Sequence, residues 1–138
     1  MCGAPSRKSH ATVRIDLPAA TPADALQAVG DAVHQALAQT FNVPHDDRFQ
    51  VLARRAPGEL VCTPEYMGVR HGANVVFVQI TCSPGRSLEM KRALYARIAT
   101  DVAARGGFKA ADVIINLVET LRENWSFGNG IAHYAPAS

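Results

Sequence analysis

The sequence contains few cysteines, little net charge and no long hydrophobic run, and each shortage excludes a class of protein. Its three cysteines, Cys2, Cys62 and Cys82, lack metal-site spacing, so reduced thiols are a simpler expectation than disulfides or zinc. No apolar stretch approaches the roughly 20 residues that cross a bilayer, and residues 1–10 lack the apolar core of a secretory signal. A net charge of +2 gives no reason to expect a nucleic-acid or membrane partner. We therefore expect a cytoplasmic protein without a metal.

The composition is that of an ordinary globular domain. Of the 138 residues, 48% are hydrophobic and 19% are charged, which is enough apolar material for one sizeable core. We expect residues 12–138 to form a single domain, preceded by an N-terminal arm at residues 1–11.

The domain contains the same pattern twice, at about residues 12–55 and 75–120. Each copy has an apolar strand, a helical stretch and a second strand, which is the pattern of a β-α-β unit with parallel strands. The four expected strands lie at residues 12–17, 48–52, 75–80 and 112–118.

Each helical stretch has one apolar face. Apolar residues recur at three- and four-residue steps, at Leu26, Val29, Val33, Leu37 and Phe41 in the first helix and at Met90, Leu94, Ile98 and Val102 in the second. Thr21 and Pro22 are typical of a helix start and Asn42 of a helix end, while the second helix should run from near Ser87 to Gly106–Gly107. Both helices should cover one face of a shared sheet.

Turn signals predict short β-hairpins beside this sheet. Pro57-Gly58 favours a turn followed by a short strand at residues 60–63, and Asn129-Gly130 favours a hairpin at residues 125–135. The expected fold is α+β, with a four-stranded mixed sheet, two helices on one face and short hairpins. Its other face would be bare and apolar, so we expect an oligomer.

Several segments resemble the tautomerase superfamily, in particular proteins similar to malonate semialdehyde decarboxylase. The resemblance extends from about Thr12 to Tyr134. It is strongest at residues 13–17, 43–51, 57–61, 85–87 and 123–128, the last of which is Glu-Asn-Trp-Ser-Phe-Gly. It implies two fused β-α-β units, a homotrimer, and activity on small oxo acids or haloacrylates without metal or organic cofactor.

The resemblance also implies a catalytic proline, which this sequence lacks. In the family an N-terminal proline opens the first strand and its secondary amine transfers protons near neutral pH. The alignment places Ala11 there, and an amide nitrogen within a chain cannot accept a proton, so weak or altered catalysis is expected. His10 is the one nearby side chain with a pKa suited to proton transfer, although a histidine in a polar arm is more often simply solvated.

Other positions of the implied pocket are present. Asp47 matches the family aspartate that positions water, although by itself it would indicate a solvated loop. Arg86 matches an arginine that binds the substrate carboxylate, for which a planar guanidinium is well suited, and a second family arginine falls near Ser83. Arg70 lies in a matching loop and is about as well explained by an exposed charge. The family's aromatic or apolar wall is matched by Trp125, Phe127 and Tyr134. Packing at a subunit interface is an alternative explanation for Trp125 and Phe127, and both roles can coexist.

Two functions remain open from the sequence. One is a tautomerase-like isomerase, or a decarboxylase or hydratase, in which Arg86 binds a small carboxylate and Asp47 positions water or a proton. The other is a non-catalytic trimeric relative that keeps the pocket for binding. Asp47, Arg86 and Trp125 favour a small-acid pocket, which both functions would use, whereas Ala11 and the ten-residue arm before it favour altered or lost catalysis.

Overall fold

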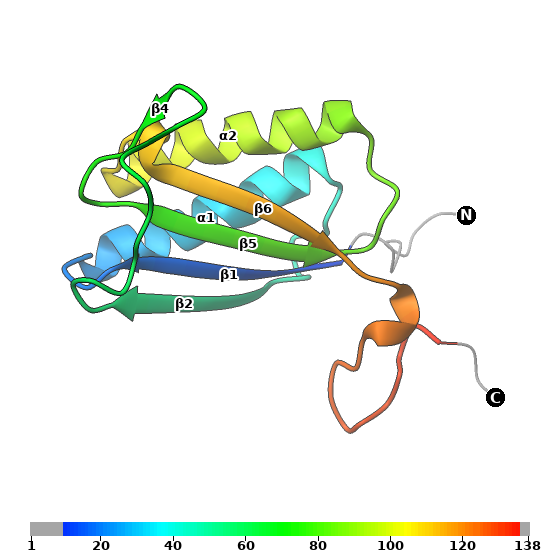
Figure 1. Cartoon of the computed structure of the whole chain (residues 1–138). Coiled ribbons are helices and arrows are strands. Elements are labelled where there is room, and N and C mark those ends of the chain that lie inside the picture. The colour runs from blue at the N-terminus through cyan, green and yellow to red at the C-terminus, as the bar shows by residue number, and fades with distance from the viewer. Residues whose placement is uncertain (1–9, 136–138) are drawn as a thin grey trace.

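The computed structural model describes residues 10–135, which form a mixed sheet with two long helices on one face (Figure 1). The first unit is β1 (Ala11–Pro18), α1 (Ala23–Thr40) and β2 (Phe49–Arg55), and the second is β5 (Val76–Cys82), α2 (Leu88–Gly106) and β6 (Val113–Glu119). The smaller elements are β3 (Glu65–Tyr66), β4 (Val69–Arg70), η2 (Ala110–Asp112) and η3 (Arg122–Asn124). The α+β fold predicted from the sequence is confirmed. The predicted arm lies outside the described residues, apart from His10 and Ala11.

The sheet has the strand order β2-β1-β5-β6. Each unit pairs its own strands in parallel, and β1 pairs with β5 in the antiparallel direction, with Ala11 opposite Cys82. The starts of β1 and β2 therefore meet the ends of β5 and β6 at one end of the sheet. The residues just outside these strands gather there, and they are Asp47, His10, Ser83 and Thr120.

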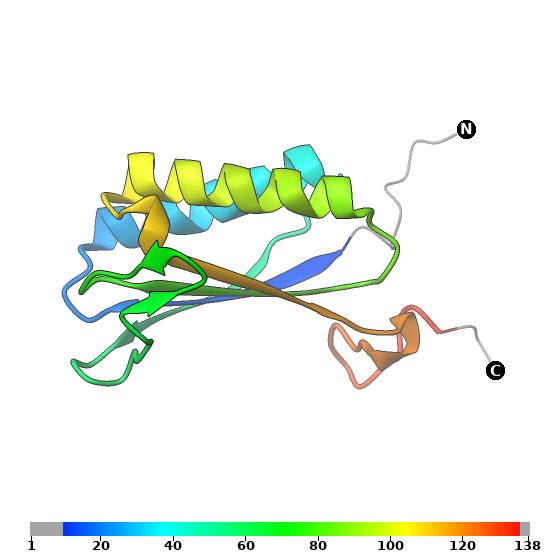
Figure 2. The ribbon, with the colours of Figure 1, turned by 45° about the horizontal axis from the view of Figure 1, so that its top comes forward.

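The core lies between the helices and the facing side of the sheet (Figure 2). Alternate residues of β1 point into it, and Val13, Ile15 and Leu17 are all buried. Helix residues on the two predicted stripes meet them, and Val29, Val33, Leu37, Leu94, Ile98 and Val102 are buried while Leu26 and Met90 pack at the margin. Among residues 10–135, no helix is long and apolar enough to cross a membrane.

Three of the four predicted helix boundaries follow the expected chemistry. Ser87 caps α2 by accepting a hydrogen bond from the Met90 amide at 3.1 Å, and Gly107 ends α2 with a φ of 79°. Asn42 follows α1 with a φ of 59°. The expected cap at Thr21 is wrong, because its hydroxyl donates instead to the Pro18 carbonyl at 2.7 Å. No side chain caps the start of α1.

Two predicted extended segments do not form. Residues 60–63 make no strand, and the hairpin nearby is the later β3–β4 pair. Residues 125–135 contain no strand either, although Asn129 and Gly130 both adopt the expected positive φ. The reason is that aromatic residues of this segment pack against the start of β1 instead of pairing as strands.

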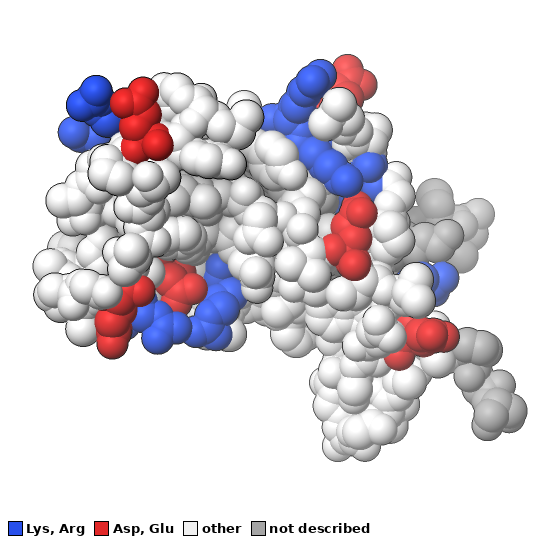
Figure 3. Space-filling view, in the orientation of Figure 1, with Lys and Arg blue, Asp and Glu red and all other residues white. Residues whose placement is uncertain are grey.

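The sheet face opposite the helices, here called the free face, is less apolar than expected. Polar residues cross its middle, with Asp16 accepting from Arg55 at 2.8 Å and lying beside Arg14 at 3.5 Å. Figure 3, which views this face, shows charged groups separated by uncharged surface. The exposed apolar side chains of the sheet itself are Phe49 and Val51 on β2, which are 46% and 48% exposed, and Val118 on β6, which is 37% exposed. The expected bare apolar face therefore also carries charged side chains.

Candidate active site

His10 lies buried at the end of the sheet where the four strand ends meet. Its side chain is 2% exposed, and Nδ1 lies 2.6 Å from Oδ1 of Asp47. Because a carboxylate can only accept, the Nδ1–H donates to Asp47. Nε2 lies 2.8 Å from the hydroxyl oxygen of Thr12. The result is a continuous chain of hydroxyl, imidazole and carboxylate.

The strand geometry explains why these three residues meet. Side chains alternate along β1, so His10 and Thr12 point to the free face while Ala11 between them points into the core. Thr12 is aligned with Phe49 in the parallel pair, which places Asp47, two residues earlier, beside His10. A threonine hydroxyl can donate or accept, so Nε2 keeps its hydrogen bond whether or not it carries a proton.

Aromatic rings enclose His10 on its other sides. Their centroids lie 5.0 Å from the imidazole for Phe49, 4.8 Å for Trp125 and 4.6 Å for Phe127, all edge to face. Trp125 and Phe127 stack at 5.4 Å, and Tyr134 lies 5.1 Å from Phe127. The structure thus brings the three residues of the predicted wall together, and its centre is a histidine.

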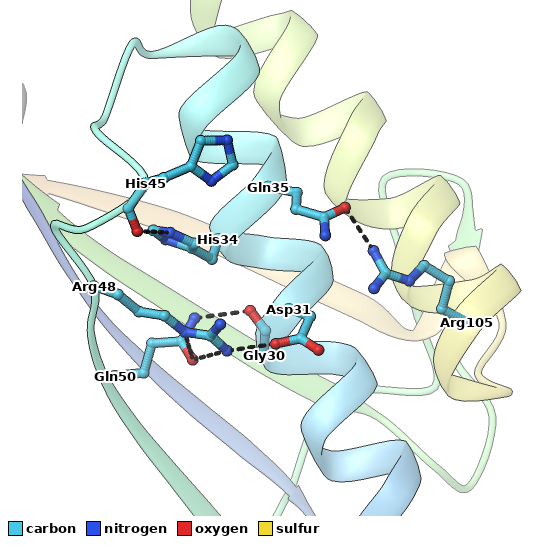
Figure 4. Close-up of polar contacts among 8 residues, drawn as sticks. All are labelled: Gly30, Asp31, His34, Gln35, His45, Arg48, Gln50 and Arg105. Atoms are coloured by element: carbon cyan, nitrogen blue, oxygen red, sulfur yellow. Dashed lines mark hydrogen bonds and ion pairs between the residues drawn. The ribbon is translucent and has the colours of Figure 1, made fainter.

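Hydrogen bonds fix the loop that carries Asp47 (Figure 4). The His34 ring on α1 donates from Nε2 to the carbonyl of His45 at 2.8 Å, and the Asp47 amide donates to Pro44 at 3.0 Å. Both bonds act on the backbone just before β2. They hold the aspartate at the start of the strand, where it faces His10.

The start of β2 is tied to α1 as well. Arg48 donates to Asp31 at 2.8 Å, and the Gln50 amide donates to the Gly30 carbonyl at 2.8 Å (Figure 4). A Cβ at Gly30 would come within 2.9 Å of Oε1 of Gln50, so a larger residue there would displace the end of this side chain. The polar contacts around Asp47 are therefore built into the packing of helix on sheet.

Arg86 reaches the same end of the sheet, but two of its nitrogens bind backbone. Nη1 donates to the Ser83 carbonyl at 3.2 Å and Nη2 to the Phe41 carbonyl at 3.3 Å, with the guanidinium 4.7 Å from the Phe41 ring centroid. The neighbouring Cys82 is fully buried, and burial raises the pKa of its thiol. Cys82 is accordingly a poor nucleophile, while Arg86 joins the segment after β5 to the end of α1.

Arg70 lies far from His10 of the same chain. It belongs to β4, near the starts of β5 and β6, and its side chain is 85% exposed beside Glu65 at 3.6 Å. It lines a separate cavity of about 950 Å³ that includes Phe77 and Ile114. The chain therefore does not bring Arg70 to the aromatic wall.

Sequence reasoning gave little weight to His10 and missed Thr12 and Phe49. The alternation of side chains along a strand could have indicated Thr12, because a strand that starts at Ala11 places His10 and Thr12 on the same face of the sheet. Within the part of the chain that the structure describes, no group of three or more histidine, cysteine or acidic side chains could hold a metal.

The fold and this site define a class of protein, a duplicated β-α-β domain with an acid–base pair at the end of its sheet. Two models of the tautomerase enzyme family match the chain, one over residues 47–128 and the other over residues 12–70. The chain therefore belongs to the tautomerase family.

Individual relatives agree with this assignment. The probable tautomerase YusQ of Bacillus subtilis (strain 168) is 36% identical over 107 residues, which cover 78% of this chain and 84% of YusQ. A crystal structure of malonate semialdehyde decarboxylase inhibited by 3-bromopropiolate is 32% identical, with a TM-score of 0.82, covering 89% of this chain and 93% of that one. A fused 4-OT symmetric trimer at 21% identity shares the fold, with a TM-score of 0.71 and coverage of 87% and 94%.

Proposed function

We propose that this protein is a cofactor-free acid–base enzyme acting on a small 2-oxo or 3-oxo acid, by tautomerase-like or decarboxylase- and hydratase-like chemistry. The observation that carries the proposal is the buried imidazole of His10, bonded to Asp47 at 2.6 Å and to Thr12 at 2.8 Å. In this proposal His10 takes over proton transfer from the family proline. The nitrogen of Ala11, at the position of that missing proline, is a peptide amide and cannot hold a proton.

The proton would move in two coupled transfers. A proton leaves the carbon next to the substrate carbonyl for Oγ1 of Thr12, while the Thr12 hydroxyl proton passes to Nε2 of His10. The electron pair of the broken C–H bond remains on the substrate as an enolate, and Asp47 stabilises the imidazolium. Reversing the transfers to the other end of the enolate completes a tautomerisation.

Burial supports this relay over direct contact with His10. The imidazole is 2% exposed, whereas Thr12 is only half-buried, so a substrate meets the hydroxyl first. The ring cluster of Phe49, Trp125 and Phe127 excludes water and strengthens electrostatic interactions at the imidazole. An indirect transfer should be slower than one through an exposed amine, so we expect weaker activity than in relatives with the proline.

A second candidate, a non-catalytic trimeric relative that binds small acids, is favoured by one observation. The rings that exclude water from the site also cover the side chain of His10 almost completely. A protein of this kind would bind an oxo acid but would not exchange its protons.

Turnover by the wild-type protein separates the two candidates. We expect the wild-type protein to convert phenylenolpyruvate to the keto form without added metal or cofactor. The conversion is measured as the loss of enol absorbance. A second readout is NMR detection of deuterium entering C3 of phenylpyruvate in D₂O. Binding of phenylpyruvate with neither turnover nor exchange above buffer would establish the non-catalytic candidate instead.

We also propose that the protein is a homotrimer assembled through the free face. Support comes from the exposed apolar residues Phe49 and Val51 on β2 and from the trimeric assembly of the fused 4-OT relative. Light scattering should give three times the 14.8 kDa of one chain. Val51→Arg should dissociate the trimer, because it places a charge in an apolar contact.

Leu88→Arg is the matched control, since Leu88 is 61% exposed at the start of α2 on the opposite side of the molecule. This variant should remain trimeric. A wild-type protein that stays monomeric at micromolar concentration would refute the assembly.

A further inference from the structure

A pocket of about 410 Å³ opens beside the aromatic wall, between the end of β5 and the C-terminal segment. Its lining includes Ser83, Arg122, Glu123 and Tyr134. Two links join it to the site of His10. Tyr134 contacts Phe127, which contacts the imidazole, and Ser83 continues β5 beyond Cys82, the strand partner of Ala11.

Ser83 carries a buried hydroxyl that has no partner. The residue is 3% exposed, and its Oγ makes no hydrogen bond among the described residues. Buried polar atoms are nearly always bonded, so an unbonded hydroxyl on a residue that lines a pocket is a candidate to bind a ligand there. Two further buried donors at this end of the sheet, the hydroxyl of Thr120 and Nε1 of Trp125, also have no hydrogen-bond partner within residues 10–135. Thr120 lies next to Ser83, since its amide donates to the Cys82 carbonyl at 2.9 Å.

Arg122 provides positive charge at the same pocket. It is exposed on η3, and its guanidinium carbon lies 5.7 Å from the centroid of the Tyr134 ring. Within residues 10–135 it makes no ion pair and no side-chain hydrogen bond. By contrast, Arg86 directs two nitrogens to backbone carbonyls, one of them the carbonyl of Ser83. Arg122 therefore has N–H donors available for a ligand at this pocket.

We propose that Arg122 and the Ser83 hydroxyl bind the carboxylate of the oxo acid, with Arg86 holding the Ser83 backbone in place. This subsite deepens the proposed function and rests on it for the choice of an oxo acid. The planar guanidinium pairs with both carboxylate oxygens, and the hydroxyl donates to one of them. Glu123 adds a negative charge to the lining, so the pocket favours an acid with a single carboxylate.

The test compares Arg122→Gln and Ser83→Ala with the wild type in binding, not turnover. Trp125 is the one tryptophan of the sequence and belongs to the aromatic wall beside this pocket, so quenching of its fluorescence is used to follow binding. Phenylpyruvate and its neutral methyl ester are the two probes. Arg122→Gln should weaken binding of the acid about 10- to 100-fold, as loss of a charge-assisted contact does, and Ser83→Ala about 5-fold. Neither variant should change binding of the ester by more than about 2-fold.

Arg92→Gln is the matched control, because it removes an exposed arginine from α2 and leaves the pocket intact. It should bind both probes as the wild type does. Equal weakening for acid and ester, or unchanged acid binding in Arg122→Gln, would overturn the subsite. Selective weakening in a protein that shows no turnover would uphold the subsite while the catalytic proposal fails.

Discussion

Replacing His10 with glutamine should lower kcat/KM for the enol–keto conversion of phenylenolpyruvate by about 10²- to 10⁴-fold, the usual contribution of a general acid–base group. Glutamine can still form hydrogen bonds with Asp47 and Thr12, but its amide cannot accept a proton at neutral pH. The loss should fall mainly on kcat, because the carboxylate contacts of the substrate do not involve this side chain. Stopped-flow or steady-state absorbance measurements check the result.

His45→Gln is the control for this experiment. His45 is exposed, and the structure uses its carbonyl, not its ring, to accept the hydrogen bond from His34. The control should keep the wild-type rate. A His10→Gln protein that keeps full kcat, with unchanged thermal stability, would remove His10 from the reaction and direct attention to another proton carrier.

The fold was predictable because its signals are local. The period of apolar residues in α1 and α2 indicates the buried faces directly, and Ser87 and Gly107 act as cap residues through contacts within a few positions. The hairpin predicted at residues 125–135 does not form, because contacts with a distant part of the sequence decide the conformation of this segment. Its turn residues adopt the expected φ, but the segment is fixed by ring contacts with His10, more than a hundred positions earlier in the chain.

The site was predictable only in part, for a similar reason. Asp47, Trp125 and Phe127 were selected through the family resemblance, and the structure brings them together. The same resemblance implied a carboxylate role for Arg86, which stays a prediction. This side chain donates to the carbonyl of Ser83 nearby in the sequence and to the carbonyl of Phe41, which only the folded chain brings close. His10 lies in a polar segment that favours solvation, and its 2% exposure depends on rings from two distant segments. The polar composition of the sequence around His10 therefore could not predict that its side chain is buried.

The arrangement of strands gives these observations a common cause. With β1 antiparallel to β5 and each unit internally parallel, two strand starts and two strand ends meet at one end of the sheet. Residues from four separate parts of the sequence therefore converge there without any of them being near another in the chain. This convergence does not depend on the side chain of Ala11, which opens β1, and in the proposed mechanism the neighbouring His10 supplies the proton carrier.

A grafted N-terminal proline should restore family-type catalysis to a protein that lacks His10. The designed variant deletes residues 1–9, replaces His10 with the initiating methionine and carries Ala11→Pro, so that removal of the methionine exposes a terminal secondary amine at the start of β1. Ala11 is 2% exposed and lies opposite Cys82, so the amine would enter a partly apolar environment, which favours its neutral form. We expect about a 10²- to 10⁴-fold higher kcat/KM on phenylenolpyruvate than for the same truncation with Ala11 retained.

The truncation that retains Ala11 is the matched control because it also lacks His10 and differs only in the terminal residue. Mass spectrometry must first show that the methionine is removed from both proteins, since an uncleaved methionine would block the amine. The comparison then separates two explanations of weak native activity. If the proline graft is active and the alanine control is not, the pocket of Asp47 and Trp125 remains competent and lacks only its proton carrier. If both truncated proteins are inactive while the wild type turns over, the chemistry of this pocket has become specific to His10, and the terminal amine can no longer replace it.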